Sequence, residues 1–124
     1  MKRMILGATL VLGALTTGAW AEGDAKAGKK VFKKCKACHT VKEGKNKVGP
    51  TLFGIVGAPA GQVEGFKYSP ALLEAGLTWD AETLRAFLTK PKDLVPGNKM
   101  SFAGLKKEKE IDDLIAYLVA ESEN

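Results

Sequence analysis

The chain has 124 residues, of which 45% are hydrophobic and 27% charged, and its formal net charge is +5. This length and the absence of any repeat, charge block or low-complexity run predict one small globular domain and exclude a multidomain protein. With two cysteines and one histidine, the chain cannot supply the four ligands that a structural zinc site needs.

The first 21 residues have the pattern of a secretory signal peptide. A basic start precedes an apolar run over residues 4–15, and Ala19-Trp20-Ala21 is a small-x-small cleavage sequence. The alternative is an uncleaved membrane anchor, but the apolar run barely reaches the roughly 20 residues that span a bilayer. We therefore expect a periplasmic domain of residues 22–124, whose charge falls to +3 when Lys2 and Arg3 leave.

A helix is predicted next. Asp24 can cap a helix that runs to about Lys34, with Val31 and Phe32 on its apolar face. Gly28 interrupts this face at a cost of about 1 kcal/mol relative to alanine, so we expect it to let another helix approach closely.

The helix leads into Cys35-Lys36-Ala37-Cys38-His39. Each thiol can add across one vinyl group of a porphyrin, and the adjacent imidazole can then bind the iron. The alternatives are a dithiol oxidoreductase, a zinc site and a disulfide. A thioredoxin-like dithiol would lie in a β-α-β unit that the sequence does not show, zinc lacks ligands, and a disulfide would close a very short, strained loop. We predict one covalently attached haem c per chain.

Residues 40–66 are rich in glycine and show no sustained period, which predicts a long ordered loop. Such a loop is unusual in a compact domain unless it wraps a large ligand. Pro50 could support the ring of His39, and apolar contact would come from Val48, Leu52, Phe53, Ile55 and Val56.

Two further helices should follow. Ser69 can cap the first, with Pro70 at its first position and Gly76 just after its end. Thr78 can cap the second, which Pro91 ends and whose buried stripe is Leu84, Phe87 and Leu88. Residues 92–104 are expected to form another loop.

The last helix has the clearest pattern. Apolar residues recur at i, i+3, i+4, i+7 and i+8 without an intervening glycine or proline, at Ile111, Leu114, Ile115, Leu118 and Val119. This helix should pack against the first one. Because strand patterns are weak throughout, we predict an all-α fold.

Met100 is the leading candidate for the sixth iron ligand. His39 is the only histidine, and the other two methionines lie in the expected leader. A lone methionine more often fills a core. Here, however, it follows a Pro96-Gly97 turn that could hold it against a haem face.

Several motifs together resemble class I cytochrome c, in particular its mitochondrial and small bacterial periplasmic carriers. They span essentially the whole chain after residue 21: Cys35-x-x-Cys38-His39, Gly49-Pro50, Gly65-Phe66-Lys67-Tyr68, Leu77-Thr78-Trp79, Pro96-Gly97-Asn98-Lys99-Met100 and Leu114-Ile115-Ala116-Tyr117-Leu118. The resemblance implies a small cytochrome c fold, with packed N- and C-terminal helices and with helices and long loops around one haem.

By this resemblance Cys35 and Cys38 are the thioether sites, and His39 and Met100 are the axial ligands. It also implies that the Pro50 carbonyl accepts the His39 Nδ1 proton and that a buried haem propionate accepts hydrogen bonds from Tyr68 and Trp79. Three positions depart from the mitochondrial pattern, where arginine, asparagine and tyrosine are usual: Ala58, Leu72 and Phe87.

The sequence thus predicts a soluble periplasmic one-electron carrier and not an enzyme. One alternative is a haem protein with a displaceable sixth ligand, acting as a peroxidase or gas binder, but no spare histidine exists for it. Another is a thiol oxidoreductase with free Cys35 and Cys38.

We expect a membrane-bound quinol-cytochrome c oxidoreductase as electron donor. The acceptor would be a terminal oxidase, a photosynthetic reaction centre or another reductase. Docking would be transient and electrostatic, by a monomer without a nucleic-acid partner. The lysines expected around the haem edge are Lys34, Lys36, Lys92, Lys99 and Lys106.

Overall fold

The computed structural model describes residues 23–123, so the predicted leader and the new terminus at Glu22 lie outside the described residues. The helices are α1 (Ala25–Val31), the 3-10 helix η2 (Phe32–Lys34), α2 (Pro70–Ala75), α3 (Ala81–Thr89), α4 (Pro91–Leu94) and α5 (Glu108–Glu121). Within this part of the chain, the only paired extended backbone is an isolated bridge between Pro59 and Thr78. The all-α prediction is confirmed.

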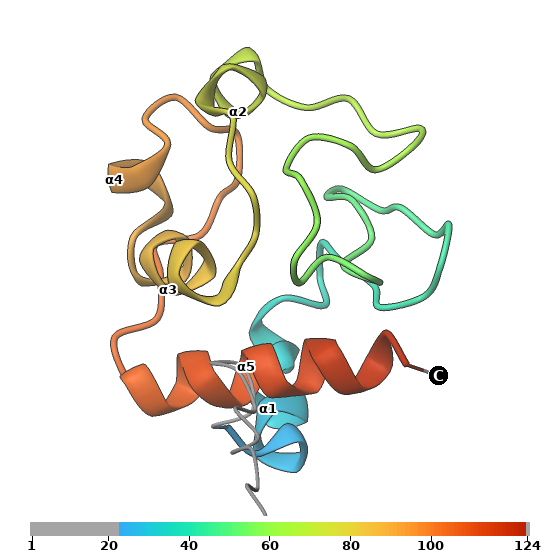
Figure 1. Ribbon diagram of the computed structural model, residues 1–124, viewed down its shortest axis with the longest axis vertical. Coiled ribbons are helices and arrows are strands. Elements are labelled where there is room, and N and C mark those ends of the chain that lie inside the picture. Colours follow the sequence, from blue (N-terminus) through green and yellow to red (C-terminus); the bar gives the residue numbers. More distant parts are fainter. Residues whose placement is uncertain (1–22, 124) are drawn as a thin grey trace, which may run out of the picture.

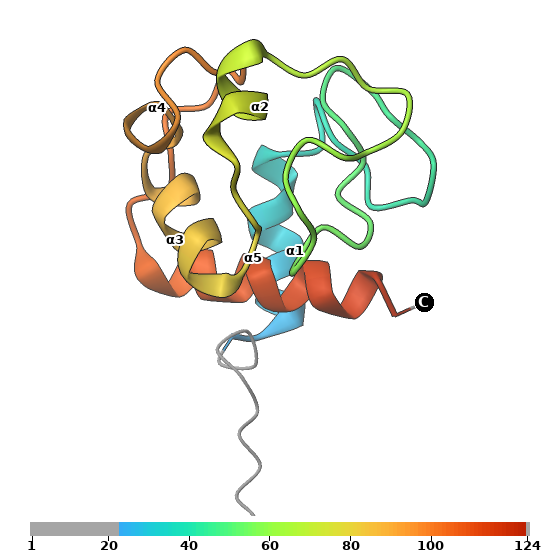
Figure 2. The ribbon, with the colours of Figure 1, turned by 45° about the horizontal axis from the view of Figure 1, so that its top comes forward.

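Helices α1 and α5 cross and pack against each other at one side of the molecule, as Figures 1 and 2 show. Gly28 lies at the crossing, where an added Cβ would be 1.9 Å from the Asp113 carbonyl oxygen and 2.7 Å from Tyr117 Cβ. The ring of Tyr117 packs on Phe32, with centroids 5.4 Å apart. The expected close approach of two helices at Gly28 is therefore confirmed.

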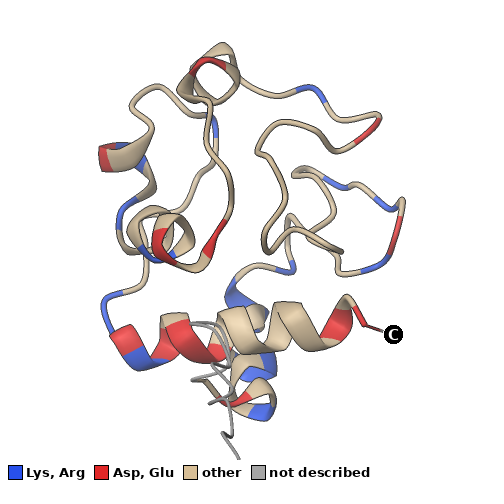
Figure 3. Ribbon diagram, viewed as in Figure 1, with Lys and Arg blue, Asp and Glu red and all other residues tan. Residues whose placement is uncertain are grey.

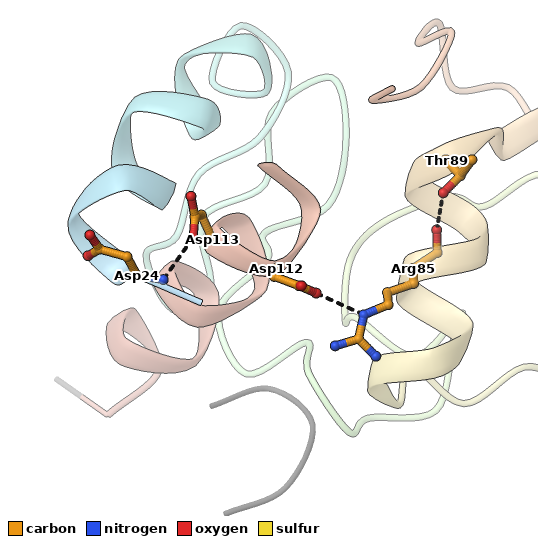
Figure 4. Close-up of polar contacts among 5 residues, drawn as sticks. All are labelled: Asp24, Arg85, Thr89, Asp112 and Asp113. Carbon is orange, nitrogen blue, oxygen red and sulfur yellow. Dashed lines mark hydrogen bonds and ion pairs between the residues drawn. The ribbon is translucent and has the colours of Figure 1, made fainter. Parts of the chain in front are cut away.

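Helix α5 is also fastened to its neighbours by two carboxylates (Figure 4). The Asp24 amide donates to Asp113 Oδ1 at 2.8 Å, which joins the start of α1 to α5. Arg85 on α3 donates through Nε to Asp112 Oδ1 at 2.8 Å. The two acids point to opposite sides of α5, so this helix holds both α1 and α3.

Two predicted helix boundaries are wrong. Asp80, not Thr78, caps α3, because the Asp80 carboxylate accepts the Thr83 amide at 2.8 Å while Thr78 is paired with Pro59. Pro91 ends α3 but also begins α4, so the predicted loop starts later than residue 92. The fixed φ of proline is already suited to a first helical turn. The caps at Ser69 and Gly76 are as predicted.

The long loop between η2 and α2 is ordered by side-chain hydrogen bonds to its own backbone. The buried Thr51 donates through Oγ1 to the Lys42 carbonyl at 2.7 Å, and its amide donates to Asn46 Oδ1 at 2.9 Å. In Figure 1 this loop forms the side of the molecule opposite α3 and α4. No helix in the described residues is both long and apolar enough to cross a bilayer.

Candidate haem-binding site

A mainly apolar cavity of about 510 Å³ lies between the long loop, α3, α5 and the segment after α4. This volume falls in the range of small-molecule and cofactor sites, roughly 300–1,000 Å³. Most of the residues that the sequence predicts around a porphyrin line it: Cys35, Cys38, His39, Val48, Pro50, Leu52, Ile55, Trp79, Leu88, Met100 and Phe102. Phe53 and Val56, which are also predicted to contact the ligand, do not line the cavity.

His39 is held in one orientation and one tautomer. Its Nδ1 lies 2.7 Å from the Pro50 carbonyl oxygen, and because a carbonyl can only accept, Nδ1 carries the proton. Nε2 is then the unprotonated nitrogen that can bind a metal. Gly49 packs against the ring, since an added Cβ would lie 2.4 Å from His39 Cε1. Burial lowers the pKa of His39, although the Pro50 hydrogen bond opposes this, and the lowered pKa favours the neutral imidazole.

Cys35 and Cys38 lie on the turn that follows η2. The His39 amide donates to the Cys35 carbonyl at 2.9 Å and the Cys38 amide donates to the same oxygen at 3.1 Å, so one turn carries both thiols and the imidazole. Both cysteines are free thiols. Burial raises the pKa of Cys35 to about 11 despite the nearby Lys34. Thiol oxidoreductases instead need a lowered thiol pKa, which disfavours that alternative.

Met100 reaches the cavity from the segment between α4 and α5. Its side chain is half-buried, and its amide donates to Asn98 Oδ1 at 2.8 Å. The donor set at this cavity is therefore one imidazole nitrogen, one thioether sulfur and two thiols, which fits a covalently attached haem with two axial ligands.

Tyr68 and Trp79 both line the cavity. Trp79 is 6% exposed and packs on Phe87, with ring centroids 4.9 Å apart. The Tyr68 hydroxyl accepts the Val63 amide at 2.9 Å, and a phenol that accepts one hydrogen bond can still donate its own proton. The chemistry of both groups suits a carboxylate acceptor.

The three positions that depart from the mitochondrial pattern supply no polar side chain. Leu72 and Phe87 line the cavity, whereas Ala58 lies on the loop, where its carbonyl accepts the Trp79 amide at 2.8 Å. Across residues 23–123, no group of three or more His, Cys, Asp or Glu side chains could hold a metal ion directly. An iron here would thus depend on a porphyrin for its remaining ligands.

Sequence reasoning missed part of the cavity wall. Leu114 and Leu118 line the cavity and also pack within the helical core. The apolar stripe of the last helix, to which they belong, predicted only a contact with the first helix. Of the five lysines predicted around the edge, Lys34 and Lys99 line the cavity, and Lys67 lines it too. Lys67 lies between two aromatic residues, Phe66 and Tyr68, and no pattern in the sequence distinguishes it from the other lysines. The wall also includes Phe66, Ser69, Leu84 and Asn98.

Comparison with known proteins gives a consistent result. A model of the cytochrome c family matches residues 25–121. The chain is 45% identical to cytochrome c2 of Blastochloris viridis over 119 residues, which covers 95% of this chain and 92% of the relative. It is 50% identical to cytochrome c of Stellaria longipes over 99 residues, which covers 78% of this chain and 92% of the relative.

Among solved structures, cytochrome cH from Methylobacterium extorquens is 52% identical with a TM-score of 0.75, over 79% of this chain and 99% of that one. The predicted fold, with N- and C-terminal helices packed together, is therefore confirmed. With a cavity that gathers both thiols, the imidazole and the thioether, and with a family match from α1 to α5, this chain belongs to the cytochrome c family of electron carriers.

Proposed function

We propose that this chain is a periplasmic one-electron carrier with one haem c, attached through Cys35 and Cys38 and ligated by His39 and Met100. The observation that carries the proposal is that all four side chains line a single cavity. When bound, the haem supplies an iron that alternates between the ferrous and ferric states.

The protein keeps the ligand set constant. Pro50 and Gly49 fix the ring of His39 from behind, and Met100 comes from a different segment of the chain. If His39 and Met100 both bind the iron, a change of iron charge would need no exchange of protein ligands. The apolar wall disfavours the more charged ferric state, so methionine and histidine ligation in this cavity raises the reduction potential.

Tyr68 and Trp79 would donate hydrogen bonds to a buried haem propionate. The apolar side chains of Ala58, Leu72 and Phe87 add no donors there, so fewer polar groups surround the propionates and the sulfur than in the mitochondrial pattern. We therefore expect the tuning of the potential to differ from that pattern.

A peroxidase or gas-binding function would require an open iron site and a distal acid or base. The cavity lining contains no Asp, Glu or Arg, and His39 is the only histidine of the chain. The described cavity wall therefore lacks a carboxylate, an arginine or a second histidine to serve as the distal acid or base, which disfavours a peroxidase.

The proposed location depends on the leader. The match to the Blastochloris viridis protein covers 95% of the chain. Because residues 23–124 alone make up a smaller share of the chain, the match must extend into the proposed signal peptide. Cleavage after Ala21 would leave a protein that begins at Glu22. Intact mass of the protein purified from a periplasmic extract tests this, and a mass that accounts for residues 1–124 plus haem would contradict it.

The proposed partners are a membrane-bound quinol-cytochrome c oxidoreductase as donor and a terminal oxidase, photosynthetic reaction centre or other reductase as acceptor. The support is the basic rim formed by Lys34, Lys67 and Lys99, the three exposed lysines that line the cavity. We call these three the rim lysines. They would attract an acidic docking surface.

A potentiometric titration followed by visible absorption distinguishes the candidate functions. We expect a single reversible one-electron transition, a haem that acidified acetone does not extract, and no change when carbon monoxide is added to the reduced protein. Rapid carbon monoxide binding would instead support the gas binder. A two-electron transition without haem absorption would support the thiol oxidoreductase.

A further inference from the structure

The segment that carries Met100 has few hydrogen bonds of its own. Over residues 99–103, the Met100 amide is the only main-chain group with a hydrogen bond in the described part of the chain. Its acceptor is the side chain of Asn98, at 2.8 Å. The position of Met100 therefore depends on what holds Asn98.

Asn98 is held by the end of α4. Its Nδ2 donates to the Val95 carbonyl at 2.9 Å and to the Pro91 carbonyl at 3.1 Å. Its own amide also donates to Val95 at 3.1 Å, closing a tight turn in which Gly97 has φ 88°. Pro91 is among the most completely buried side chains, and Val95 is 2% exposed. One amide side chain thus joins the Met100 backbone to two carbonyls of the fixed core.

The other end of the segment is anchored separately. The Leu105 amide donates to the Leu88 carbonyl at 2.7 Å, and an added Cβ on Gly104 would lie 2.0 Å from the Thr89 carbonyl oxygen. Residues 99–103 therefore span two fixed points. Met100 lies next to the first of them, so Asn98 restricts it more closely than the Leu105 contact does.

We propose that Asn98 is a positioning residue for the sixth ligand, and that its amide bridge sets how often the Met100 sulfur leaves the iron. This rests on the proposed ligation by Met100. The bridge acts by tying the main chain of Met100 to α4. Partners that orient a metal ligand in this way typically change ligand affinity by about 10- to 100-fold when they are removed.

Loss of the bridge should leave the fold intact. The Pro91 carbonyl still accepts the Val95 amide at 2.9 Å, and the Val95 carbonyl still accepts the Asn98 amide. Only the Met100 amide loses its partner in an Asn98→Ala protein. Asn98→Asp keeps an acceptor for that amide but loses both donated hydrogen bonds to α4.

The test uses imidazole binding to the ferric haem protein in a stopped-flow instrument. At saturating imidazole, the observed rate equals the rate at which the Met100 segment opens. We expect this rate to rise by about 10- to 100-fold in Asn98→Ala and also to rise in Asn98→Asp. Ala103→Ser is the matched control, because Ala103 is exposed on the same segment and does not line the cavity. Its rate should equal that of the wild type.

Hydrogen exchange gives a second readout that does not depend on imidazole. The Met100 amide should exchange faster in Asn98→Ala than in the wild type or in Ala103→Ser, with circular dichroism unchanged. Wild-type imidazole rates and wild-type Met100 exchange in either Asn98 variant would overturn the positioning role while leaving the proposed function intact. If the wild-type ferric protein lacks the sulfur-to-iron absorption band, Met100 is not the ligand and both proposals fail.

Discussion

Asp113 is a buried carboxylate on α5 whose two oxygens are both engaged. Oδ2 accepts a hydrogen bond from Lys109 Nζ at 2.7 Å, and Oδ1 accepts one from the Asp24 amide at 2.8 Å. The residue is 5% exposed. The Lys109 hydrogen bond and then that of Asp24 hold the pKa of Asp113 below its ordinary value, so the folded protein favours the ionised form.

The Asp113→Asn protein should be less stable than the wild type by about 2 kcal/mol at pH 7, because charge-assisted hydrogen bonds are lost. A lowered folded pKa gives stability that is complete above the unfolded pKa of about 4 and is lost as the pH falls through the folded value. Urea unfolding at pH 7 and pH 3 should therefore show the difference between the two proteins shrinking in acid. Glu108→Gln, at an exposed site on the same helix, is the control. A difference of equal size at both pH values would contradict this account.

Single residues of the site were predictable to different degrees. The spacing of Cys35, Cys38 and His39 predicts their grouping because one turn carries all three, and Met100 followed by elimination. The role of Asn98 could not be predicted from the sequence. Its side chain donates to carbonyls three and seven residues away, and only the folded α4 brings these carbonyls into reach. Capping by Asp80 was missed because Thr78 is an equally good cap until its bridge with Pro59 is known.

The crossing of α1 and α5 is the element-level contact on which the cavity depends. Leu114 and Leu118 face the cavity from α5, and Cys35 enters it from the turn that continues α1 and η2. Any change in the distance between the two helices would shift the cavity wall and the two cysteines relative to each other. Gly28 sets that distance.

Replacing Gly28 with alanine should destabilise the protein even though alanine is the better helix former by about 1 kcal/mol. The new Cβ would overlap the Asp113 carbonyl, a main-chain atom that can move only with α5. Overpacking of this kind costs about 1–3 kcal/mol. Thermal unfolding by circular dichroism should show a lower midpoint for Gly28→Ala than for Lys29→Ala, an exposed control on the same helix. If Gly28→Ala is as stable as Lys29→Ala or more stable, the contact between α1 and α5 has room for an added methyl group, which contradicts this account.

Most helices could be predicted from periodicity and caps, since each has a stripe or a Ser-Pro or Asp start. Helix α4 could not be predicted, because four residues are too few to show a helical hydrophobic period. Pro91 also fits the end of one helix as well as the start of the next. The long loop was predicted by composition alone. Its internal order comes from Thr51 and Asn46, whose partners the sequence does not specify.

At the scale of the molecule, charge is distributed unevenly. Figure 3 shows acidic residues at both ends of α5 and on α3, with lysines on α1 and along the loops. The rim lysines lie at the cavity, although Lys34 is also 3.7 Å from Glu110 in a largely exposed ion pair. Exposed pairs of this kind are weak. The cavity mouth therefore keeps a positive edge.

That edge predicts how the reduced protein reacts with ferricyanide, an anionic oxidant. The rate constant should fall by on the order of tenfold as salt is raised, since screening extends over only about 8 Å at physiological ionic strength. At low salt, Lys67→Gln should slow the reaction more than Lys29→Gln, which removes the same charge on α1 away from the cavity lining. Equal effects of the two variants, or a rate independent of salt, would remove the rim lysines from the mechanism.

The central claim is that Met100 and His39 close both sides of the iron, and cyanide binding to the ferric Met100→Ala protein tests it most directly. Lys99→Ala is added in a second variant, so that the neighbouring lysine does not take the vacated position. Both variants should keep covalent haem through Cys35 and Cys38, lose the weak sulfur-to-iron absorption band, show a lower potential, and bind cyanide on the order of 100-fold more tightly than the wild type. Retention of that band together with wild-type cyanide affinity would contradict the claim.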